Sequence, residues 1–394
     1  MIMKRVLLLG AGYANISLLK SLPLMQDTTI TLISNNPYHY MSVLLHEVAS
    51  GERGENVLFG LSGMFDEYIN IIQDEILEIQ HDKVIGKKNA YEYDILVIGL
   101  GFSSDTFGIP GIKEFTLSLV NYKEALVIYE TLKQNLAAYK QTKDKSKLQI
   151  AVCGGGFSGS ELSASLAQEL PKMCAKEGID PTLVKIYCIE AMPEILPMFP
   201  EPLSKAGRAY LSKLGVEVLS GSKILECKKG EVIIQNNQGT QSIFAETIIW
   251  TAGVKGNEVI EKSSFFESKR SRLEVDGFLN PINQKTPMDH IFVAGDCAAV
   301  LDKAIQRFFP PTAQIALKQG EYLAKSLSAK LNDEPFSEEF HFESKGTFCS
   351  LGKYYGIGMT SNKTFKGKIA IWIKRFIELR WSYKISGLGG ILRF

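Results

Sequence analysis

Two glycine-rich segments of this chain have the residue types and spacing of phosphate-binding turns. One occupies residues 10–15 and follows an apolar run at 6–9; the other occupies residues 154–159 and follows an apolar run at 150–153. The first glycine of such a turn allows a tight bend, the second lets the backbone approach a pyrophosphate, and the third lets helix and strand pack closely. The N-terminus of the following helix then binds the negative charge. Two such turns predict two dinucleotide sites in one chain, with electrons passing from one dinucleotide to the other.

The two turns differ at the third glycine position. The second turn has all three glycines, at Gly154, Gly156 and Gly159, whereas the first has Gly10 and Gly12 but then Asn15. Because asparagine is bulkier than glycine, Asn15 argues against close packing of helix and strand in the first unit. The alternative for either segment is an ordinary glycine-rich loop.

Residues that bind the ribose are expected at the end of the second strand of each unit. In the second unit this residue is Glu190, which can accept hydrogen bonds from both ribose hydroxyls and would repel a 2′-phosphate. It therefore favours NADH over NADPH; the alternative is a surface carboxylate at a strand end. In the first unit the position falls at residues 34–36 (Ser-Asn-Asn), where Asn35 can still bind a hydroxyl.

A Gly-Asp pair ends a late apolar strand. Asp296, after Gly295, could place its carboxylate on a ribityl hydroxyl. A helix that begins at Cys297 is expected to point its N-terminus at a flavin phosphate. The alternative for Asp296 is a simple helix N-cap.

The elements that must position these residues follow one plan, used twice. Each half has a buried strand, a glycine turn, a helix, a second strand and a later apolar strand that ends in glycine. Strands are expected at 5–9, 30–33, 93–101, 148–153, 183–190, 246–251 and 290–296, and helices at 13–22, 123–139 and 312–331. This alternation predicts an α/β fold with two nested, Rossmann-like, doubly wound units.

Composition excludes several classes of protein. The 394 residues are 45% hydrophobic and 22% charged, which is typical of a folded chain of two or three domains. A net charge of +1 gives no reason to expect nucleic acid as a partner. The six cysteines form no C-x-x-C pair, so no metal site is predicted and the thiols are expected to be reduced and buried. The sequence contains no stretch of about 18 uncharged apolar residues, so no transmembrane helix is predicted.

Together these features resemble the two-dinucleotide flavoproteins, and more closely the type II NADH dehydrogenases, which are single-subunit NADH:quinone oxidoreductases of the membrane surface. The resemblance covers essentially the whole chain. It rests on the segments 10–13 (G-A-G-Y), 38–40 (Y-H-Y), 154–161 (G-G-G-F-S-G-S-E), 250–254 (W-T-A-G-V), 294–297 (A-G-D-C) and 310–316 (P-P-T-A-Q-I-A).

This resemblance implies two binding sites and three regions. FAD would be held by Gly10, Gly12, Tyr13, Ala14, Asn15, Asn35, His39, Gly101, Gly295, Asp296, Ala313 and Gln314. NADH would be held by Gly154, Gly156, Phe157, Gly159, Glu161, Glu190 and Gly253. Residues 1–115 and 268–335 would form a discontinuous FAD-binding domain, residues 116–267 an NADH-binding domain, and residues 336–394 a C-terminal membrane-anchoring region.

The implied reaction passes a hydride from NADH to flavin N5 and two electrons onward to a membrane quinone at a separate opening. It would be a non-proton-pumping entry to a respiratory chain. Glu161 is the candidate for tuning protonation or placing the nicotinamide, because an apolar site near a flavin would raise its pKa. The alternative is a first-turn acid favoured by the helix dipole. Gln314 would lie near the flavin ring at the quinone site.

Three positions at the implied quinone site depart from the family pattern. Lys318 stands where the quinone motif usually has a second glutamine, and Val43 and Leu44 replace polar residues after Tyr40. Lys318 could place a cation near a quinone oxygen or could equally point to solvent. These changes leave the fold unaffected and bear on the rate, the quinone type and the electron acceptor.

The C-terminal segment 363–394 interleaves bases and aromatic residues. An apolar stripe at helical spacing consists of Ile369, Trp372, Ile373, Phe376 and Ile377. The bases are Lys363, Lys366, Lys368, Lys374, Arg375, Arg380 and Lys384. Such a helix would lie in the headgroup region with its bases toward anionic lipid, which predicts a peripheral protein on the cytoplasmic face of the cell membrane. The alternatives are a helix that packs in a dimer or in the core, and homodimer formation is left open.

Two other functions stay open from the sequence. A sulfide:quinone oxidoreductase shares the fold but needs cysteines against the flavin; Cys349 could lie there, whereas Cys153 is expected to be buried against the sheet. Glu190 and the intact second glycine turn argue against sulfide as the substrate. The remaining alternative is a non-catalytic flavoprotein that senses NADH or scaffolds a partner, which the departures at Asn15 and Lys318 would allow.

Overall fold

The first of two parallel sheets carries the N-terminal glycine turn. The computed structural model describes residues 3–65 and 68–393. The sheet has the order β23-β9-β1-β2-β5, and its strands are β1 (Lys4–Leu9), β2 (Thr28–Ser34), β5 (Ile69–Gln73), β9 (Ile95–Ile98) and β23 (Ile291–Val293). Leu9 pairs with Ile33 on one side and with Ile98 on the other, so three strands end side by side. The apolar residues of β1 are buried from both faces, as parallel strands require.

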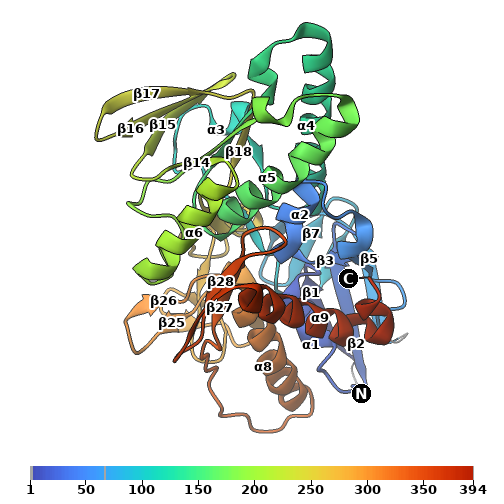
Figure 1. Ribbon diagram of the computed structural model, residues 1–394. Coiled ribbons are helices and arrows are strands. Elements are labelled where there is room, and N and C mark those ends of the chain that lie inside the picture. Colours follow the sequence, from blue (N-terminus) through green and yellow to red (C-terminus); the bar gives the residue numbers. More distant parts are fainter. Residues whose placement is uncertain (1–2, 66–67, 394) are drawn as a thin grey trace.

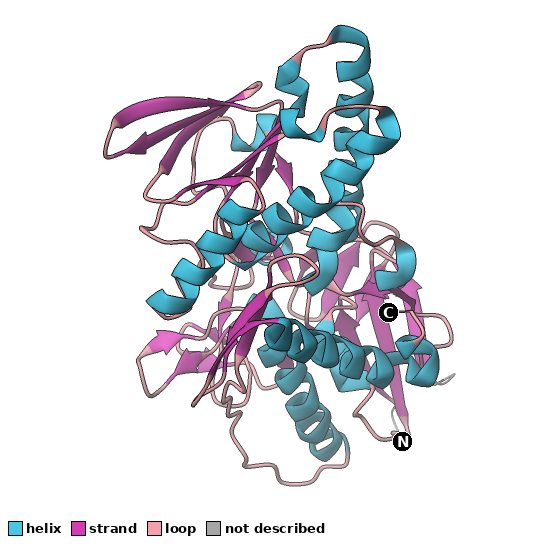
Figure 2. Ribbon diagram, in the orientation of Figure 1, coloured by secondary structure: helices cyan, strands magenta, loops and turns pink. Residues whose placement is uncertain are grey.

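The second sheet repeats this arrangement in the middle of the chain (Figure 2). Its order is β11-β18-β12-β13-β14, and its strands are β11 (Leu117–Ser118), β12 (Gln149–Cys153), β13 (Lys185–Ile189), β14 (Val216–Leu219) and β18 (Thr247–Trp250). All of these strands run parallel. Helices α4 (Tyr122–Thr142), α5 (Phe157–Glu177) and α6 (Glu201–Lys213) belong to this unit. The predicted α/β fold with two Rossmann-like sheets is therefore confirmed.

The sheets contact each other through the segments that follow their apolar strands. After β9 the chain forms β10 (Phe102–Ser104), and after β18 it forms β19 (Val254–Gly256); these two strands pair antiparallel. The Asn257 side-chain amide also donates to the Leu100 carbonyl at 3.0 Å. Because β23 joins the first sheet only after the whole second sheet has been completed, the first unit is discontinuous in sequence. The boundaries at 115, 267 and 335 stay predictions.

Helices α1 (Tyr13–Leu19) and α8 (Ala313–Leu331) pack against one another beside the first sheet (Figure 1). A side chain at Gly320 would collide with the Ala14 carbonyl, so this glycine sets the close approach of the two helices. The Ser17 hydroxyl donates to the Leu317 carbonyl at 2.9 Å across the same contact. Thr312 caps α8 through a hydrogen bond from the Ile315 N–H.

The prediction that a helix begins at Cys297 is wrong. The chain makes a single 3₁₀ turn at Gly295–Cys297 and then forms β24 (Ala298–Ala299), which pairs with β20 (Leu273–Glu274). The side chains from Cys297 to Val300 are buried, and Arg272 donates to the Ala298 carbonyl at 2.6 Å. An extended buried segment therefore forms where a helix was expected, and the next helix in the chain is α8.

The C-terminal region is a small antiparallel sheet followed by a long helix. The sheet contains β27 (Thr347–Ser350), β28 (Gly356–Met359) and β29 (Thr364–Gly367), and α9 (Lys368–Ile391) follows with a break at residues 386–387. Figure 1 shows α9 lying across the first unit. No helix within residues 3–65 and 68–393 is long and apolar enough to cross a membrane. Phe394, the last residue of the predicted anchor, lies outside the described residues.

Short elements complete the two units. In the first unit they are β3 (Tyr38–Tyr40), α2 (Leu45–Ala49), β4 (Leu58–Gly60), β6 (Ile76–Ile79), β7 (Lys83–Gly86) and β8 (Ala90–Glu92). In and after the second unit they are α3 (Ile112–Phe115), β15 (Lys223–Lys228), β16 (Glu231–Asn236), β17 (Gly239–Phe244), α7 (Glu258–Lys262), β21 (Ile282–Asn283), β22 (Thr286–Pro287), β25 (Leu301–Asp302) and β26 (Arg307–Phe308).

Candidate functional site

A cavity of about 970 Å³ lies where the first sheet, the second sheet and the C-terminal region meet. Its size is at the upper end of the usual range for small-molecule sites, about 300–1,000 Å³. Its lining comes from residues at the carboxyl ends of β1, β2 and β9, from the start of α5, from the start of α8, and from the segment 342–348. Ligands of open parallel sheets bind at this edge.

The first glycine turn forms one wall of the cavity. Gly10, Gly12, Tyr13 and Ala14 line it. Gly10 has a φ of +91°, and a side chain there would collide with the Gly99 carbonyl. No described side chain caps the start of α1, so its first N–H groups are free to meet a ligand. The turn therefore fits the pyrophosphate of a dinucleotide.

Asn15 lies beneath the turn and not in the cavity lining. Its side-chain amide donates to the carbonyls of Leu9 and Gly10, each at 2.8 Å. The residue that faces it is Gly99, where an added Cβ would lie 2.7 Å from the Asn15 nitrogen. The missing third glycine is thus compensated by a glycine directly after the neighbouring strand β9. Asn15 was expected to argue against close packing of helix and strand, but Gly99 provides the space for its side chain.

His39 also lies behind the turn. It is 1% exposed, its Nδ1 lies 2.8 Å from the Ala11 carbonyl, and its Nε2 accepts a hydrogen bond from the Trp381 indole at 3.2 Å. Burial lowers the pKa of His39 to about 4, against the opposing effect of the Ala11 hydrogen bond. The ring is therefore neutral with its proton on Nδ1. His39 supports the glycine turn from behind, and the prediction that it contacts the cofactor is not supported.

All of the other predicted residues of the first site line the cavity. They are Asn35, Gly101, Gly295, Asp296, Ala313 and Gln314. Burial raises the pKa of Asp296 to about 6, against the opposing charge of Arg272. A polar carboxyl at the end of β23 therefore faces the cavity, as the sequence predicted.

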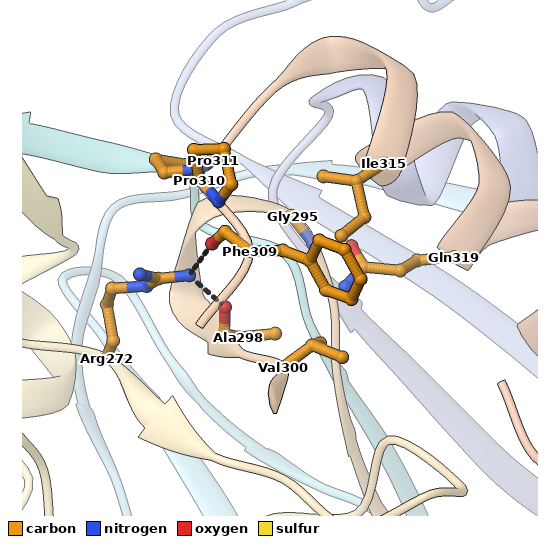
Figure 3. Close-up of a pocket in the computed structure, with 9 residues that line it drawn as sticks. All are labelled: Arg272, Gly295, Ala298, Val300, Phe309, Pro310, Pro311, Ile315 and Gln319. Atoms are coloured by element: carbon orange, nitrogen blue, oxygen red, sulfur yellow. Dashed lines mark hydrogen bonds between the residues drawn. The ribbon is translucent and has the colours of Figure 1, made fainter. Parts of the chain in front are cut away.

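Two residues that sequence reasoning missed support this part of the wall (Figure 3). Gln319 accepts a hydrogen bond from the Gly295 N–H at 2.7 Å, and Gly295 has a φ of +68°. Arg272 reaches the carbonyls of Ala298 and Phe309 at 2.6 and 3.5 Å (Figure 3). The adjacent residues Gly295, Phe309, Pro310 and Pro311 line both the small hollow of Figure 3 and the main cavity. Gln319 directly follows Lys318, the position where the family motif has its second glutamine, and this proximity could have indicated Gln319 from the sequence.

The second glycine turn meets the same cavity from the other sheet. Phe157 and Glu161 line the cavity, whereas Gly154, Gly156 and Gly159 lie outside its lining. Gly154 has a φ of +122°, and a side chain at Gly159 would collide with the Gly154 carbonyl. The turn therefore needs these glycines for its own shape.

Glu190 lies at the second turn, as predicted. One carboxylate oxygen accepts the Gly155 N–H at 2.7 Å and the other accepts the Met192 N–H at 2.8 Å. Gly253, directly before β19, has a φ of +124°, and a side chain there would collide with the Phe107 ring. Each carboxylate oxygen of Glu190 retains a lone pair for a ribose hydroxyl.

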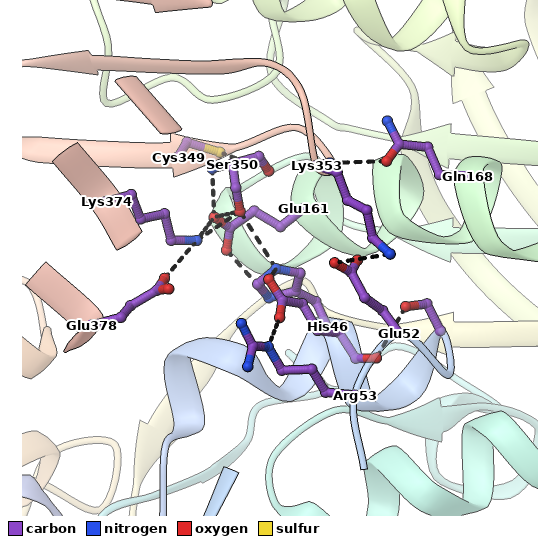
Figure 4. Close-up of polar contacts among 12 residues, drawn as sticks. His46, Glu52, Arg53, Glu161, Gln168, Cys349, Ser350, Lys353, Lys374 and Glu378 are labelled. Carbon is purple, nitrogen blue, oxygen red and sulfur yellow. Dashed lines mark hydrogen bonds and ion pairs between the residues drawn. The ribbon is translucent and has the colours of Figure 1, made fainter. Parts of the chain in front are cut away.

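A buried polar cluster joins the second sheet to the C-terminal helix (Figure 4). Glu161 accepts hydrogen bonds from the backbone N–H and the hydroxyl of Ser350, at 2.8 and 2.9 Å, and it forms an ion pair with Lys374. The Ser350 hydroxyl lies 2.7 Å from Lys374 Nζ and 3.5 Å from His46 Nε2. His46 Nδ1 lies 3.6 Å from the second oxygen of Glu161. Glu161, His46 and Lys374 line the cavity, so this cluster faces whatever binds there.

The predicted rise in the pKa of Glu161 is wrong. Burial favours the protonated acid, but Lys374, His46 and the Ser350 hydrogen bond outweigh it and lower the pKa of Glu161. Burial lowers the pKa of Lys374, yet the carboxylates of Glu161 and Glu378 raise it above its ordinary value. Glu161 and Lys374 are thus both charged, and the outward orientation expected for Lys374 is also wrong.

Gln314 and Lys318 on α8 lie in different surroundings. Gln314 lines the cavity, donates to the Gly346 carbonyl at 3.2 Å and accepts the Lys345 N–H at 2.9 Å. Lys318 lies outside the cavity lining, and its ammonium pairs with Glu321 at 2.7 Å. The placement of Lys318 does not support the predicted catalytic role, because the side chain turns to the partly exposed side of the helix.

The residues that could have indicated other chemistry are buried elsewhere. All six cysteines are free and buried, as expected. Among the described residues none of the cavity-lining side chains is a cysteine, and Cys349 follows the lining residues Thr347 and Phe348 on β27. The described part of the chain contains no group of three or more His, Cys, Asp or Glu that could hold a metal ion.

The two apolar residues that depart from the family pattern lie in different places. Val43 lines the cavity, but Leu44 is fully buried in the core.

Two parallel sheets, each with a glycine turn, meet at one cavity, which the first turn lines directly and the second reaches through Phe157 and Ser158. This arrangement is that of an oxidoreductase with two dinucleotide-binding units. A sequence profile of the pyridine nucleotide-disulphide oxidoreductase family matches residues 4–320. Over 395 residues the chain is 38% identical to the type II NADH:quinone oxidoreductase of Staphylococcus aureus strain MSSA476, an alignment that covers 98% of this chain and 97% of that protein. The chain therefore belongs to the type II NADH:quinone oxidoreductases of the pyridine nucleotide-disulphide oxidoreductase family.

Solved structures show the same fold at lower sequence identity. NDH2 from Plasmodium falciparum in complex with NADH has a TM-score of 0.85 and 20% identity, covering 100% of this chain and 97% of that chain. The sulfide:quinone oxidoreductase of Aquifex aeolicus has a TM-score of 0.77 and 21% identity, covering 98% of this chain and 92% of that chain. These likenesses establish the shared architecture alone.

Proposed function

We propose that this chain binds FAD, oxidises NADH and reduces a quinone. The observation that carries the proposal is the single cavity that extends from the first glycine turn to the buried pair Glu161–Lys374. Bound FAD would supply the carrier that takes up a hydride from NADH and passes two electrons to the quinone. The protein would supply binding, orientation and protons.

The residues of the first unit fit FAD. Gly10, Gly12 and the start of α1 would receive the pyrophosphate, and Asn35 and Asp296 would bind hydroxyl groups. The second unit would hold NADH through its glycine turn and Glu190, with Phe157 at the border between the two ligands. The carboxylate of Glu190 would disfavour the additional phosphate of NADPH.

The polar cluster would serve the quinone side of the reaction. A quinone that takes up two electrons also takes up two protons, and Lys374 and His46 are the proton-bearing side chains of this cluster that line the cavity. Burial lowers the pKa of His46 against the opposing charge of Glu161, which favours a neutral ring that donates through one nitrogen and accepts through the other. Glu161 would hold Lys374 in place as a charged donor. Gln314, fixed by the backbone of 345–346, would bind at the same opening.

The outer face of α9 supports a peripheral position on a membrane. The side chains of Ile369, Trp372, Phe376 and Ile377 are 51–72% exposed, although they are large and apolar. Trp and Tyr next to bases are typical of helices that lie in the headgroup region. We therefore infer that α9 rests on the cytoplasmic leaflet, where NADH is available and a membrane quinone can enter the cavity.

Spectroscopy of the purified protein tests the proposed function. The protein should be yellow, NADH should bleach it faster than NADPH does, and a water-soluble quinone should restore the colour. Sulfide should leave the spectrum unchanged, because no described cysteine lines the cavity. A colourless protein that does not bind added FAD would overturn the proposal.

A further inference from the structure

Glu378 is a buried acid next to the cavity to which the proposed function assigns no role. Glu378 lies on α9, four residues after Lys374, and is 6% exposed. Its carboxylate lies 3.9 Å from Lys374 Nζ, on the side of the ammonium away from Glu161 in Figure 4. Glu378 lies outside the lining of the cavity, whereas Lys374 lies within it.

Lys374 is therefore positioned between two carboxyl groups. Its contacts with Glu161 and Ser350 are direct, whereas 3.9 Å to Glu378 is too long for a hydrogen bond, so a small movement of either side chain would bring the two groups into direct contact. We propose that Glu378 returns a proton to Lys374 after Lys374 has donated one into the cavity. This proposal rests on the proposed quinone reduction. In this step the O–H bond of the Glu378 carboxyl breaks, an N–H bond forms on the Lys374 amine, and the resulting carboxylate later takes a proton from solvent.

The surroundings of Glu378 favour this role. Its charged neighbours are Lys374 on the same helix, Glu161 on α5, Glu47 on α2 and Arg53 in the loop after α2. Burial raises the pKa of Glu378 to about 7; Lys374 and Arg53 oppose the rise, and Glu47 and Glu161 add to it. The acid therefore holds a proton below about pH 7 and loses it above. Because the pKa of Lys374 is raised above its ordinary value, transfer of a proton from Glu378 to a neutral Lys374 amine is favourable.

The proposal also requires a supply of protons to Glu378 from outside the cavity. Two of the charged neighbours of Glu378, Glu47 and Arg53, form an ion pair with side chains that are 14% and 15% exposed. In the same region Glu52 lies 3.6 Å from Lys353, which pairs with Glu169 at 3.0 Å (Figure 4). We therefore expect protons to reach Glu378 past this partly exposed ion pair.

Rapid kinetics of the FAD-loaded protein test the proposal through the variant Glu378→Gln. Glutamine keeps the size of the side chain but carries no exchangeable acid proton. After reduction by NADH, reoxidation by a water-soluble quinone should slow by at least about tenfold near pH 6. The wild-type rate should fall as the pH rises through about 7. The variant should be slow throughout, so the two rates converge near pH 8.

Matched controls separate proton supply from structure. Reoxidation by ferricyanide, which takes electrons without protons, should be unchanged in Glu378→Gln, and so should reduction by NADH. Glu334→Gln, the same change at an exposed acid, should behave as wild type. Glu378→Asp should restore part of the quinone rate together with its pH dependence.

Three results would overturn the proposal. One is a Glu378→Gln variant whose quinone rate equals that of wild type at every pH. Another is an equal loss with ferricyanide, which would indicate a structural role. If the variants do not fold, a wild-type quinone rate that is flat between about pH 6 and 8 decides against it. A wild-type protein that quinone does not reoxidise at all contradicts the proposed function instead.

Discussion

At the scale of single residues, the roles of Asn15 and Glu161 are set by neighbours that are distant in the sequence. Asn15 occupies the place of a glycine, and Gly99, directly after β9, gives it space. Glu161 is surrounded by donors, so the acid is a fixed anion and not the raised-pKa proton donor that an apolar pocket would produce. In both cases the partner determines what the residue does.

Gly99→Ala should weaken the first dinucleotide site. An added Cβ would lie 2.7 Å from the Asn15 amide, and overpacking of this kind costs about 1–3 kcal/mol. We expect a lower melting temperature and loss of bound flavin, measured by thermal unfolding and by the flavin-to-protein ratio. The double variant Gly99→Ala/Asn15→Gly should recover part of both. Gly60→Ala, where nothing lies within 4 Å, is the control. Equal flavin content in all variants would contradict this explanation of Asn15.

Glu161→Gln should slow quinone-dependent turnover by about 10–100-fold while flavin stays bound. Lys374 would lose its direct carboxylate partner, and a buried charge left without its partner costs about 3–5 kcal/mol. Steady-state rates and flavin content measure the two effects. The same change at the exposed Glu177, near the end of the same helix, is the control. Unchanged turnover would remove Glu161 from the mechanism.

Acid should weaken the contact between α5 and α9. Because the pKa of Glu161 is lowered in the folded chain, its stabilising contribution is present above the ordinary glutamate value of about 4.5 and is lost as the pH falls through the lower, folded value. Thermal unfolding of wild type and Glu161→Gln across this range should therefore converge at low pH. A constant difference in melting temperature would show that ionisation of Glu161 does not stabilise the fold.

At the scale of elements, α9 has two faces with different tasks. Lys374, Glu378 and Trp381 point inward to the cavity cluster and to His39, whereas Trp372 and Phe376 are exposed on the other side. On the proposed function, α9 would contact lipid with its outer face and complete the site with its inner face. Removal of the whole segment therefore tests two functions together.

Variants of the outer face separate the two tasks. Trp372→Ser/Phe376→Ser should abolish pelleting with anionic vesicles and keep turnover with a water-soluble quinone within about twofold. A chain that ends before Lys363 should lose both, because Lys374 and Trp381 are removed as well. Phe244→Ser, at an exposed aromatic residue of β17, is the control. Vesicle binding by the double variant would argue against α9 as the membrane contact.

At the scale of the whole molecule, two similar units divide the work because their strand ends differ. The first unit ends β2 with asparagines that line the cavity, and the second ends β13 with Glu190. On the proposed function, the first unit would retain FAD while the second would exchange NADH. The cavity between them would let both ligands meet and would leave the side near Lys374 for the acceptor.

Glu190→Gln should reduce the discrimination between NADH and NADPH. The negative charge that repels a 2′-phosphate is removed, so we expect the KM for NADH to rise by about tenfold, equivalent to about 1.4 kcal/mol, and the KM for NADPH to fall. Steady-state kinetics with both nucleotides provide the measurement. Glu217→Gln on the neighbouring strand β14 is the control, since its side chain is exposed. An unchanged ratio of the two KM values would show that Glu190 does not set nucleotide preference.

Much of the fold and of the two turns could be predicted because the signals are local. Short apolar runs that end in glycine predicted β1, β9, β12 and β18. Gly10, Gly154 and Gly159 of the two turns have the positive φ angles or close approaches that only glycine permits. The helix expected at Cys297 failed because a buried apolar segment of this length fits a strand as well as a helix. Its pairing with β20 is not visible in the local sequence.

The sequence by itself determined the class of protein, the two dinucleotide turns and the acid at Glu190, since each depends on residues that are close together in the chain. Only the tertiary structure decided the charge of Glu161, the inward turn of Lys374 and the supporting role of His39. Lys374 is 213 residues from Glu161, and Trp381 is 342 residues from His39. The pKa of a buried group depends on the charges that folding brings beside it, so these properties follow from the packing of α9 and not from any local pattern.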